Sequence, residues 1–396
     1  MKSRDDLRVD KFLSKNNFPL TLIDAYKQKG IRNFYDWQFE CLAESDVLTG
    51  KNLVYSAPTS GGKTLVAEIA ILKRVLSATR KIALFILPFV SIVVEKLRYF
   101  QKLLKGSGID VVGLYSNKGL RSLSADTKIV ICTIEKANVL VNRFLKEKAM
   151  SNICCVVLDE LHMLGDANRG FLLELMLSKI MYWRRKIDVQ VIGLSATLPN
   201  LEDISKWLDA SLFVTNFRPI PLKELFCCEN TVFNSKLEKI GKIDFDEQEK
   251  PKNNEIRILS KLCDESLKEN KSVLVFGSSK KICENTAKWL SMIAKERPRN
   301  DLKNGLRRAE ILEKLSKTQF GLDEVLNLSV PNGIAFHHSG LTVEERDVIE
   351  TGFRDGTLSV LVATSTLAVG VNLPANKVII RSMRIGLDSL DLVMYK

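Results

Sequence analysis

Short apolar runs alternate with longer stretches of helical period between residues 30 and 215. The runs are continuously apolar and often β-branched, as are strands that a parallel sheet buries on both faces. The stretches between them, such as residues 63–78, 90–104 and 170–183, repeat their apolar positions as helices do. This alternation predicts a doubly wound α/β domain over residues 30–215. The predicted strands are residues 52–56, 82–87, 129–133, 155–158 and 190–194.

The rest of the chain divides into an N-terminal segment, a linker and a second α/β region. Residues 1–29 precede the first domain, and residues 216–254 contain three prolines and mixed charges, which predict a linker with a few strands of its own. Over residues 255–396 a smaller alternation returns and predicts a second domain, with a ligand cleft between the two. Within it, residues 295–308 carry six Lys or Arg and predict an insertion or a long polar helix. The predicted strands of this region are residues 273–276, 333–336, 359–363 and 377–381.

The net charge of the chain indicates which kinds of binding partner suit it. Fifty-nine Lys and Arg against 47 Asp and Glu leave a formal net charge of +12. Such an excess suits a polyanion such as nucleic acid, or an anionic membrane surface, although a basic protein without such a partner is the alternative. The longest uncharged apolar run, residues 82–94, is interrupted by Pro88 and is shorter than the ~18 residues of a membrane span. We therefore expect no membrane insertion.

The cysteines and histidines indicate the compartment and exclude common metal sites. Eight cysteines are scattered without a CxxC pattern, and the chain has three histidines. Neither a zinc site nor a disulfide framework is expected from this pattern. The sequence predicts a protein of a reducing compartment.

A phosphate-loop pattern directly follows the first predicted strand, with alanine in place of the first glycine. Two consecutive glycines allow backbone N–H groups to close around phosphate oxygens at the positive end of the next helix. Lys63 can reach the β- and γ-phosphates, and the Thr64 hydroxyl can bind Mg²⁺. A glycine-rich turn before a helix is the alternative interpretation. The residues predicted to bind ATP here are Ala57, Pro58, Thr59, Ser60, Gly61, Gly62, Lys63 and Thr64.

Two carboxylates follow the very apolar run 153–158. The carboxyl end of a buried parallel strand is where such sheets bind ligands. We expect Asp159 to hold Mg²⁺ through water, and Glu160 to orient or deprotonate the attacking water. An acidic pair that only caps a turn is the alternative, but the phosphate loop upstream favours a hydrolytic pair.

Two hydroxyl residues follow the strand at 190–194, one βα unit after the carboxylates. Ser and Thr at a strand exit usually form a turn or a cap. The position of Ser195 and Thr197 nevertheless predicts that they couple the nucleotide site to whatever crosses the top of the sheet. His162 has no partner at metal-ligand spacing, so we expect it to hydrogen-bond to the 195–197 segment.

These motifs together resemble the superfamily 2 nucleic-acid helicases, which have two tandem RecA-like domains. Within them the chain is similar to the DNA-repair helicases related to the helicase portion of DNA polymerase theta and to its paralogue helicase Q. The matching motifs run in family order from about residue 20 to residue 396. Besides the phosphate loop, they are residues 36–38 (DWQ), 86–89 (ILPF), 132–136 (CTIEK), 159–163 (DELHM), 336–341 (FHHSGL) and 363–374 (ATSTLAVGVNLP).

The resemblance implies roles for matching positions. Gln38 would read the adenine edge, and Gly370, Val371 and Asn372 would lie between nucleotide and DNA. Small hydroxyls and N–H groups in several turns would contact phosphates of the tracking strand, which positions it without reading sequence. Solvated turns are the alternative for each. The implied nucleic-acid residues are Thr133, residues 88–91, Ser278, Ser279, Lys280, His338, Ser339, Gly340 and Thr366.

One expected element is missing from the matched pattern. Such helicases carry a Gly-Arg-rich element soon after the Asn-Leu-Pro segment, and the resemblance implies that its arginines contact the γ-phosphate. Arg381 and Arg384 do not match it, and the chain stops at Lys396. We therefore expect a truncated second domain whose independent activity is in doubt.

The predicted function is an ATP-dependent DNA helicase that moves 3′-to-5′ on single-stranded or forked DNA and acts in DNA repair in the nucleus. ATP and Mg²⁺ are the expected cofactors. An RNA helicase of the same superfamily and a non-catalytic, ATP-gated DNA-binding module are the alternatives. A small-molecule kinase would not need the second set of motifs.

Overall fold

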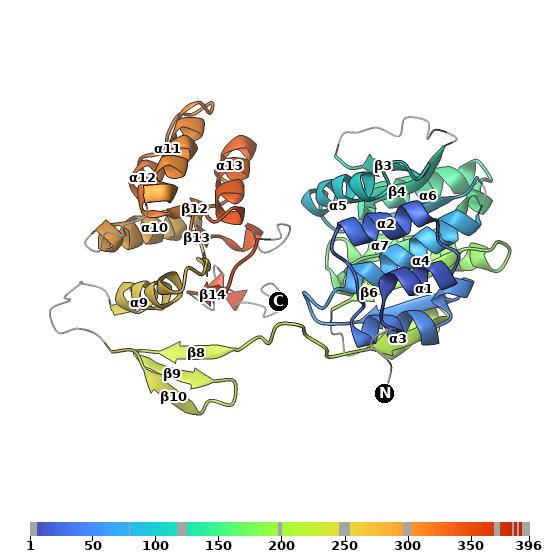
Figure 1. Ribbon diagram of the computed structural model, residues 1–396, viewed down its shortest axis with the longest axis horizontal. Coiled ribbons are helices and arrows are strands. Elements are labelled where there is room, and N and C mark those ends of the chain that lie inside the picture. Colours follow the sequence, from blue (N-terminus) through green and yellow to red (C-terminus); the bar gives the residue numbers. More distant parts are fainter. Residues whose placement is uncertain are drawn as a thin grey trace. The chain divides into compact units, whose positions relative to one another are not determined.

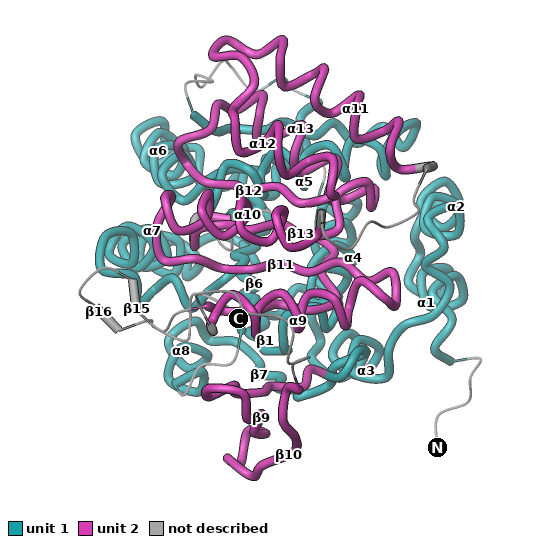
Figure 2. Tube along the Cα trace, turned by 90° about the vertical axis from the view of Figure 1, so that its left-hand side faces the viewer, with its two compact units in different colours: residues 1–221 teal, residues 222–396 magenta. Residues whose placement is uncertain are grey.

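The computed structural model describes residues 6–78, 80–116, 124, 126–196, 200–244, 254–295, 302–367, 373–381, 384–385 and 388–389. The chain divides into two compact units, residues 1–221 and residues 222–396, which Figure 2 draws in different colours. The boundary lies within the segment 216–254 that the sequence marks as a linker. Each unit is built on its own parallel sheet, which confirms the two RecA-like domains.

The first unit contains a seven-stranded sheet in the order β3-β4-β2-β5-β6-β1-β7, with every pairing parallel. The five predicted strands are present, and every residue of β1, β2, β5 and β6 is buried. Two edge strands, β3 and β7, were not predicted. Only two residues of β3 are buried, and every residue of β7 is half-buried or exposed, so neither strand has the continuous burial of the central strands. The strands are β1 Asn52–Ser56, β2 Ile82–Leu87, β3 Asp110–Leu114, β4 Thr127–Thr133, β5 Ile153–Leu158, β6 Gln190–Ser195 and β7 Ala210–Val214.

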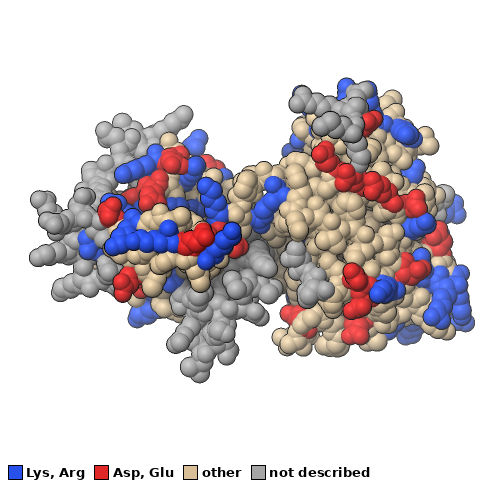
Figure 3. Space-filling view, turned by 90° about the horizontal axis from the view of Figure 1, so that it is seen from below, with Lys and Arg blue, Asp and Glu red and all other residues tan. Residues whose placement is uncertain are grey.

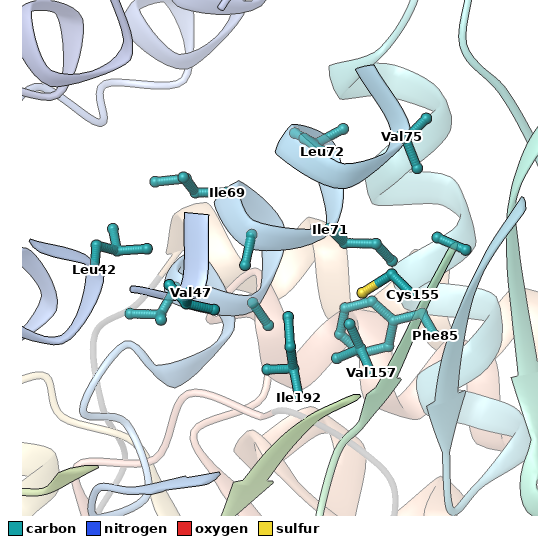
Figure 4. Packing of buried hydrophobic residues seen from close by; sticks show 14 of the residues in the cluster. Leu42, Val47, Ile69, Ile71, Leu72, Val75, Phe85, Cys155, Val157 and Ile192 are labelled. Carbon is teal, nitrogen blue, oxygen red and sulfur yellow. The ribbon is translucent and has the colours of Figure 1, made fainter. Parts of the chain in front are cut away.

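Helices cover both faces of this sheet and form two apolar clusters. One cluster joins helices α1 to α5 to the sheet, and the other joins α6, α7 and α8 to its opposite face. Figure 4 shows Ile71 of α4 above Phe85 of β2, Val157 of β5 and Ile192 of β6. The helices are α1 Val9–Lys15, α2 Leu20–Gln28, α3 Asp36–Glu44, α4 Lys63–Ser77, α5 Val90–Leu103, α6 Ile134–Lys146, α7 Gly170–Arg184 and α8 Leu201–Trp207, with 3₁₀ turns η1 Val47–Thr49, η2 Met150–Asn152 and η3 Leu161–Gly165.

The N-terminal segment is part of the first unit. Leu13 of α1 and Leu22 and Tyr26 of α2 are fully buried, and they belong to the same cluster as helix α4. Helices α1, α2 and α4 lie together in Figure 1. The burial of these apolar side chains stabilises the face of the sheet that carries α4.

The second unit has a four-stranded parallel sheet in the order β12-β13-β11-β14, with its own core. Residues 302–308, within the predicted insertion or polar helix, are the first turns of α11. A separate antiparallel sheet of β8, β9 and β10 occupies the linker region. The elements are β8 Leu225–Cys228, β9 Thr231–Asn234, β10 Lys239–Lys242, α9 Asn254–Lys268, β11 Val273–Phe276, α10 Lys280–Lys295, α11 Leu302–Ser316, α12 Glu324–Ser329, η4 Val330–Asn332, β12 Ile334–His337, α13 Val343–Arg354, β13 Val360–Ala363, η5 Ser365–Leu367, β14 Lys377–Ile380, β15 Arg384–Ile385 and β16 Asp388–Ser389.

Two further sequence expectations concern membranes and cysteines. Among the residues that the structure describes, no helix has the length and apolar character that crossing a bilayer requires. All eight cysteines are free thiols, and six of them are buried.

Candidate nucleotide and nucleic-acid sites

The phosphate loop lies between β1 and α4, at the carboxyl end of its strand. Gly62 has φ +84° and precedes the first residue of α4, and a Cβ atom on it would lie 2.5 Å from Gln38 Nε2. A Cβ atom on Gly61 would lie 2.9 Å from the Pro58 carbonyl oxygen. Both positions therefore require glycine. Ala57 is buried and has no positive φ, so an alanine fits where the general pattern has its first glycine.

Lys63 begins helix α4 and folds back over the loop. Its Nζ donates a 3.0 Å hydrogen bond to the Ala57 carbonyl oxygen, and the Tyr55 hydroxyl donates a 2.7 Å bond to the Lys63 carbonyl oxygen. Lys63 and Thr64 are half-buried at the start of the helix. The first N–H groups of a helix lack partners within it and favour anions. The arrangement suits a bound phosphate chain.

Residues upstream and downstream in sequence also contact this loop. The Gln38 amide donates a 2.8 Å hydrogen bond to the Gly62 carbonyl oxygen, and Trp37 Nε1 donates a 3.1 Å bond to that of Gly61. Sequence reasoning missed two residues here. The Phe217 ring lies 5.0 Å from that of Tyr35, and Arg218 donates a 2.9 Å bond to the Thr59 hydroxyl.

These missed residues lie in the segment predicted to be a linker. The detectable signal was an aromatic residue and an arginine just after the half-buried run 210–214. No local motif distinguishes them from ordinary linker residues.

Asp159 and Glu160 follow β5, and β6 lies between β5 and β1 in the sheet. The Asp159 carboxylate accepts a 3.0 Å hydrogen bond from the Glu160 backbone N–H, and Glu160 has φ +55°. Burial raises the pKa of Asp159 to about 6, and the charge of Glu160 adds to this, while Lys96 and Lys63 act in the opposite direction. The phosphate loop and the carboxylates thus lie on the same side of one sheet, at the carboxyl ends of its central strands.

The donors at this edge fit a magnesium ion. Mg²⁺ prefers hard oxygen ligands and is usually held by one or two carboxylates together with substrate phosphates. A half-buried carboxylate beside a second carboxylate is such a donor, and Thr64 supplies a hydroxyl. Among the described residues, no group of three His, Cys, Asp or Glu side chains forms a metal cage. Thr64 and Asp159 would therefore share the ion with the nucleotide.

The prediction for His162 is wrong where it concerns Ser195. His162 Nδ1 lies 3.2 Å from Glu160 Oε2 without hydrogen-bond geometry, and the buried Ser195 hydroxyl has no partner. Ser195 is the last residue of β6 and is fully buried. His162 lies in the η3 turn, and its imidazole lies next to Glu160. Burial lowers the pKa of His162, and the charge of Lys63 lowers it further. Thr197 lies outside the described residues.

The loops of the first unit that were expected to contact DNA follow neighbouring strands. Residues 88–91 come after β2, and Thr133 ends β4, which pairs with β2 in register. The residue Thr133 is buried and precedes helix α6. Arg169, which sequence reasoning missed, bonds to Pro88 after β2 and to Glu135 in the first turn of α6.

In the second unit, two expected DNA loops lie close together. Ser279 and Lys280 are exposed after β11, Ser278 is half-buried, and Ser339 is exposed after β12. A Cβ atom on Gly340 would lie 3.5 Å from Lys280 Cδ, so the two loops adjoin. The side chain of Thr366 and the residues Gly370, Val371 and Asn372 lie outside the part of the chain that the structure describes.

The side chain of His338 is not available for a DNA contact. His338 is buried and stacks on Phe336 at 5.0 Å between ring centroids. Its Nδ1 accepts a 3.1 Å hydrogen bond from the Gly340 N–H, so the proton is on Nε2, which donates a 3.0 Å bond to Glu284. The ring shapes the loop, and a phosphate contact at this position would use the backbone.

Arg381 is held by another residue of the second unit. Its guanidinium donates hydrogen bonds of 2.7 and 3.3 Å to the two carboxylate oxygens of Glu255 in α9.

Comparison with known proteins gives two family matches. The DEAD/DEAH box helicase model matches residues 38–204, and the helicase conserved C-terminal domain matches residues 307–390. The first match contains the phosphate loop and the carboxylates, and the second contains the 336–341 segment.

Similar proteins cover nearly the whole chain. DNA polymerase theta of Mus musculus is 45% identical over 99% of this chain, which corresponds to 16% of that protein. Helicase POLQ-like of Homo sapiens is 39% identical over 96% of the chain and 35% of that protein. ATP-dependent DNA helicase Hel308 of Methanocella arvoryzae is 32% identical over 94% of the chain and 48% of that protein. The chain thus spans less than half the length of each of these relatives.

Proposed function

Because this chain belongs to the superfamily 2 helicases, we propose that it couples ATP hydrolysis to 3′-to-5′ movement along single-stranded or forked DNA in DNA repair. The sub-family part of the proposal is supported by similarity to DNA polymerase theta and Helicase POLQ-like proteins. The DNA part is supported by similarity to proteins named ATP-dependent DNA helicases. A nuclear location follows from a repair role, and the distribution of a fluorescently tagged chain in cells would test it.

The single observation that supports ATP hydrolysis is that the phosphate loop and the two carboxylates lie at the carboxyl ends of nearby strands in the first sheet. The phosphate loop after β1 and the carboxylates after β5 are separated only by the end of β6. Lys63 would neutralise the β- and γ-phosphates, and the Gly61–Gly62 backbone would approach them closely. Glu160 would orient the attacking water. Its carboxylate would also accept a proton from this water as the water oxygen bonds to the γ-phosphorus. Catalysis would thus be positional and electrostatic.

Magnesium would supply charge neutralisation across the phosphates when bound. Thr64 and Asp159 would hold it. The Asp159 carboxylate accepts a hydrogen bond from the Glu160 N–H, and this bond fixes the orientation of the Asp159 side chain. This arrangement supports the assignment of Asp159 to the metal and of Glu160 to the water.

Nucleic-acid contacts would come from turns at the carboxyl ends of strands. Ser278, Lys280 and Ser339 supply hydroxyl and ammonium donors on adjoining loops of the second unit. In the first unit, residues 88–91 and Thr133 follow adjacent strands. Such donors match a phosphate backbone and not base edges, so binding would be independent of sequence.

The test is ATP turnover by the 396-residue chain with and without single-stranded DNA. We expect Lys63→Ala to abolish both turnovers while the chain stays folded. Lys51→Ala is the matched control, because Lys51 lies just before the same strand β1 and pairs with Asp46 at the surface. Wild-type turnover in Lys63→Ala would refute the assignment of the nucleotide site.

Two other outcomes would indicate the alternatives. Stronger stimulation by RNA of the same length would indicate an RNA helicase. Binding of DNA that responds to ATP without turnover would indicate an ATP-gated binding module. Unwinding of duplexes with a single-stranded tail on one end or the other measures the direction of movement.

A further inference from the structure

Arg169 lies in the loop that joins the carboxylate segment to helix α7, and this loop is firmly built. The Asp166 carboxylate accepts hydrogen bonds of 2.9 and 2.8 Å from the N–H groups of Asn168 and Arg169. A Cβ atom on Gly170 would lie 2.3 Å from the Leu164 carbonyl oxygen, so only glycine fits after Arg169. The backbone therefore presents the Arg169 side chain in one direction.

The Arg169 guanidinium contacts two strand-to-helix junctions of the first unit, one after β2 and one after β4. Its Nε donates a 2.8 Å hydrogen bond to Glu135 in the first turn of α6, and Nη2 donates to the Pro88 carbonyl oxygen. The guanidinium carbon also lies 5.4 Å from the centre of the Phe89 ring. Phe89 precedes α5, and Glu135 lies two residues after Thr133. These two junctions hold residues 88–91 and Thr133, which we propose contact the DNA backbone.

A short series of hydrogen bonds connects Arg169 to Glu160. The Met163 N–H donates a 2.9 Å bond to the Glu160 carbonyl oxygen, and the Asp166 N–H donates a 3.0 Å bond to that of Met163. The Asp166 carboxylate then holds the Arg169 N–H. These bonds join the backbone of Glu160 to that of Arg169 through two consecutive turns.

We propose that Arg169 is a positioning residue that holds the strand-to-helix junctions at residues 88–91 and 133–136 in fixed register with the carboxylate segment, so that DNA binding and ATP hydrolysis are coupled. This inference rests on the proposed function. The guanidinium suits the task because its planar fork can bind a carboxylate and a carbonyl oxygen together while its face stacks on a ring. A lysine has no such fork.

A purely stabilising role is the competing explanation, and it makes a different prediction. Glu135 is about half-exposed, with 47% of its side-chain surface accessible, and ion pairs of this kind add little to stability. A stabilising contact would change the unfolding temperature, whereas a positioning contact changes the response of turnover to DNA.

The experiment measures ATP turnover of the 396-residue chain against the concentration of a single-stranded oligonucleotide. For Arg169→Ala we expect unchanged DNA-independent turnover and a half-saturating DNA concentration raised by about tenfold or more, as for the loss of a charge-assisted hydrogen bond. Arg169→Lys should be intermediate, and Glu135→Gln should weaken the response less than Arg169→Ala. Arg184→Ala is the matched control, because Arg184 is the last residue of α7, the helix that Arg169 precedes, and it forms an ion pair with Asp209.

Each outcome decides the question. An unchanged DNA response in Arg169→Ala, or an equal loss of turnover with and without DNA, would overturn the proposal. A lowered unfolding temperature in Arg169→Ala moves the decision to Arg169→Lys and Glu135→Gln, where a wild-type DNA response would overturn it. A wild-type chain that turns over ATP without any stimulation by DNA would refute the proposed function, and the coupling with it.

Discussion

The side-chain amide of Gln38 donates a 2.8 Å hydrogen bond to the carbonyl oxygen of Gly62, the last residue before helix α4. The amide oxygen of Gln38 accepts a 2.9 Å bond from the Tyr35 N–H, and the side chain is buried. A carboxamide has two donors and two acceptor lone pairs, so one of each remains. We propose that the same side chain braces the phosphate loop and pairs with the N6 and N7 edge of an adenine.

Replacing Gln38 separates these two functions. Gln38→Ala should raise the ATP concentration for half-maximal turnover by about tenfold or more, because it removes a buried hydrogen bond to the loop. It should also reduce the preference for ATP over GTP, since the adenine edge loses its partner. Kinetics with both nucleotides measure the two effects. Glu40→Gln on the same helix is the control, and an unchanged ATP preference in Gln38→Ala would exclude adenine reading.

Glu160→Gln should separate binding from chemistry. The amide keeps the size and position of the side chain but is a poor base, so turnover should fall by roughly 10²-fold or more. Nucleotide affinity, measured by calorimetry, should stay within a few-fold of that of the wild type. Glu174→Gln, at an exposed position of α7, should match the wild type in both assays. A collapse of nucleotide affinity in Glu160→Gln would mean that Glu160 is structural.

DNA binding should depend on salt and only weakly on base sequence. Among the described residues on the face shown in Figure 3, Lys and Arg side chains are interspersed with Asp and Glu. Discrete contacts should therefore determine the slope of log K against log salt, at about −0.7 per phosphate of a single strand. Lys280→Ala should reduce the slope by about one such contact. Lys206→Ala, at an exposed position of α8, should leave it unchanged, and a flat salt dependence of the wild type would contradict the phosphate-contact proposal.

Glu68 in helix α4 should make stability depend on pH. Its carboxylate accepts a 2.9 Å bond from the Tyr99 hydroxyl and lies 3.9 Å from Lys96 Nζ, and burial raises the pKa of Glu68. A carboxyl group whose pKa is raised by folding contributes stability below its unfolded pKa of about 4.3, and this contribution is lost as pH rises through the folded pKa.

Glu68→Gln should remove that loss. The difference in unfolding free energy between Glu68→Gln and the wild type should therefore grow in favour of the variant as pH rises from about 4.3 upward. Glu68→Ala should cost about 1–3 kcal/mol, since the Tyr99 hydroxyl loses its acceptor. Urea unfolding across pH measures both variants. A difference that does not change with pH would mean that folding does not shift the pKa of Glu68.

The parts of the fold that were predictable are those with a strong local pattern. The central strands β1, β2, β5 and β6 are buried on both faces, and a continuously apolar run reports that burial directly. Edge strand β7 has one half-exposed face and was not predicted. Helices α1 and α2 were treated as a separate segment, because nothing in their local sequence tells which surface their apolar sides cover.

The candidate site divides in the same way. The phosphate loop and the carboxylate pair are contiguous motifs, and their chemistry can be read from residue type and order alone. The His162 prediction failed for Ser195 because the direction of an imidazole depends on how the η3 turn packs against the sheet edge. Residue identity limits which bonds a side chain can make, but packing selects among them.

The sequence by itself determined the two α/β units, the phosphate loop at residues 57–64 and the acids that follow β5, because periodicity and motif chemistry are local properties of a chain. Only the tertiary structure decided which side chains meet across it. Gln38 binds Gly62 over 24 positions, His338 binds Glu284 over 54, and Arg169 binds Pro88 over 81. Such pairs form where strands and helices distant in sequence are packed side by side. Their geometry arises from the closing of the core around the sheet, and no local pattern records it.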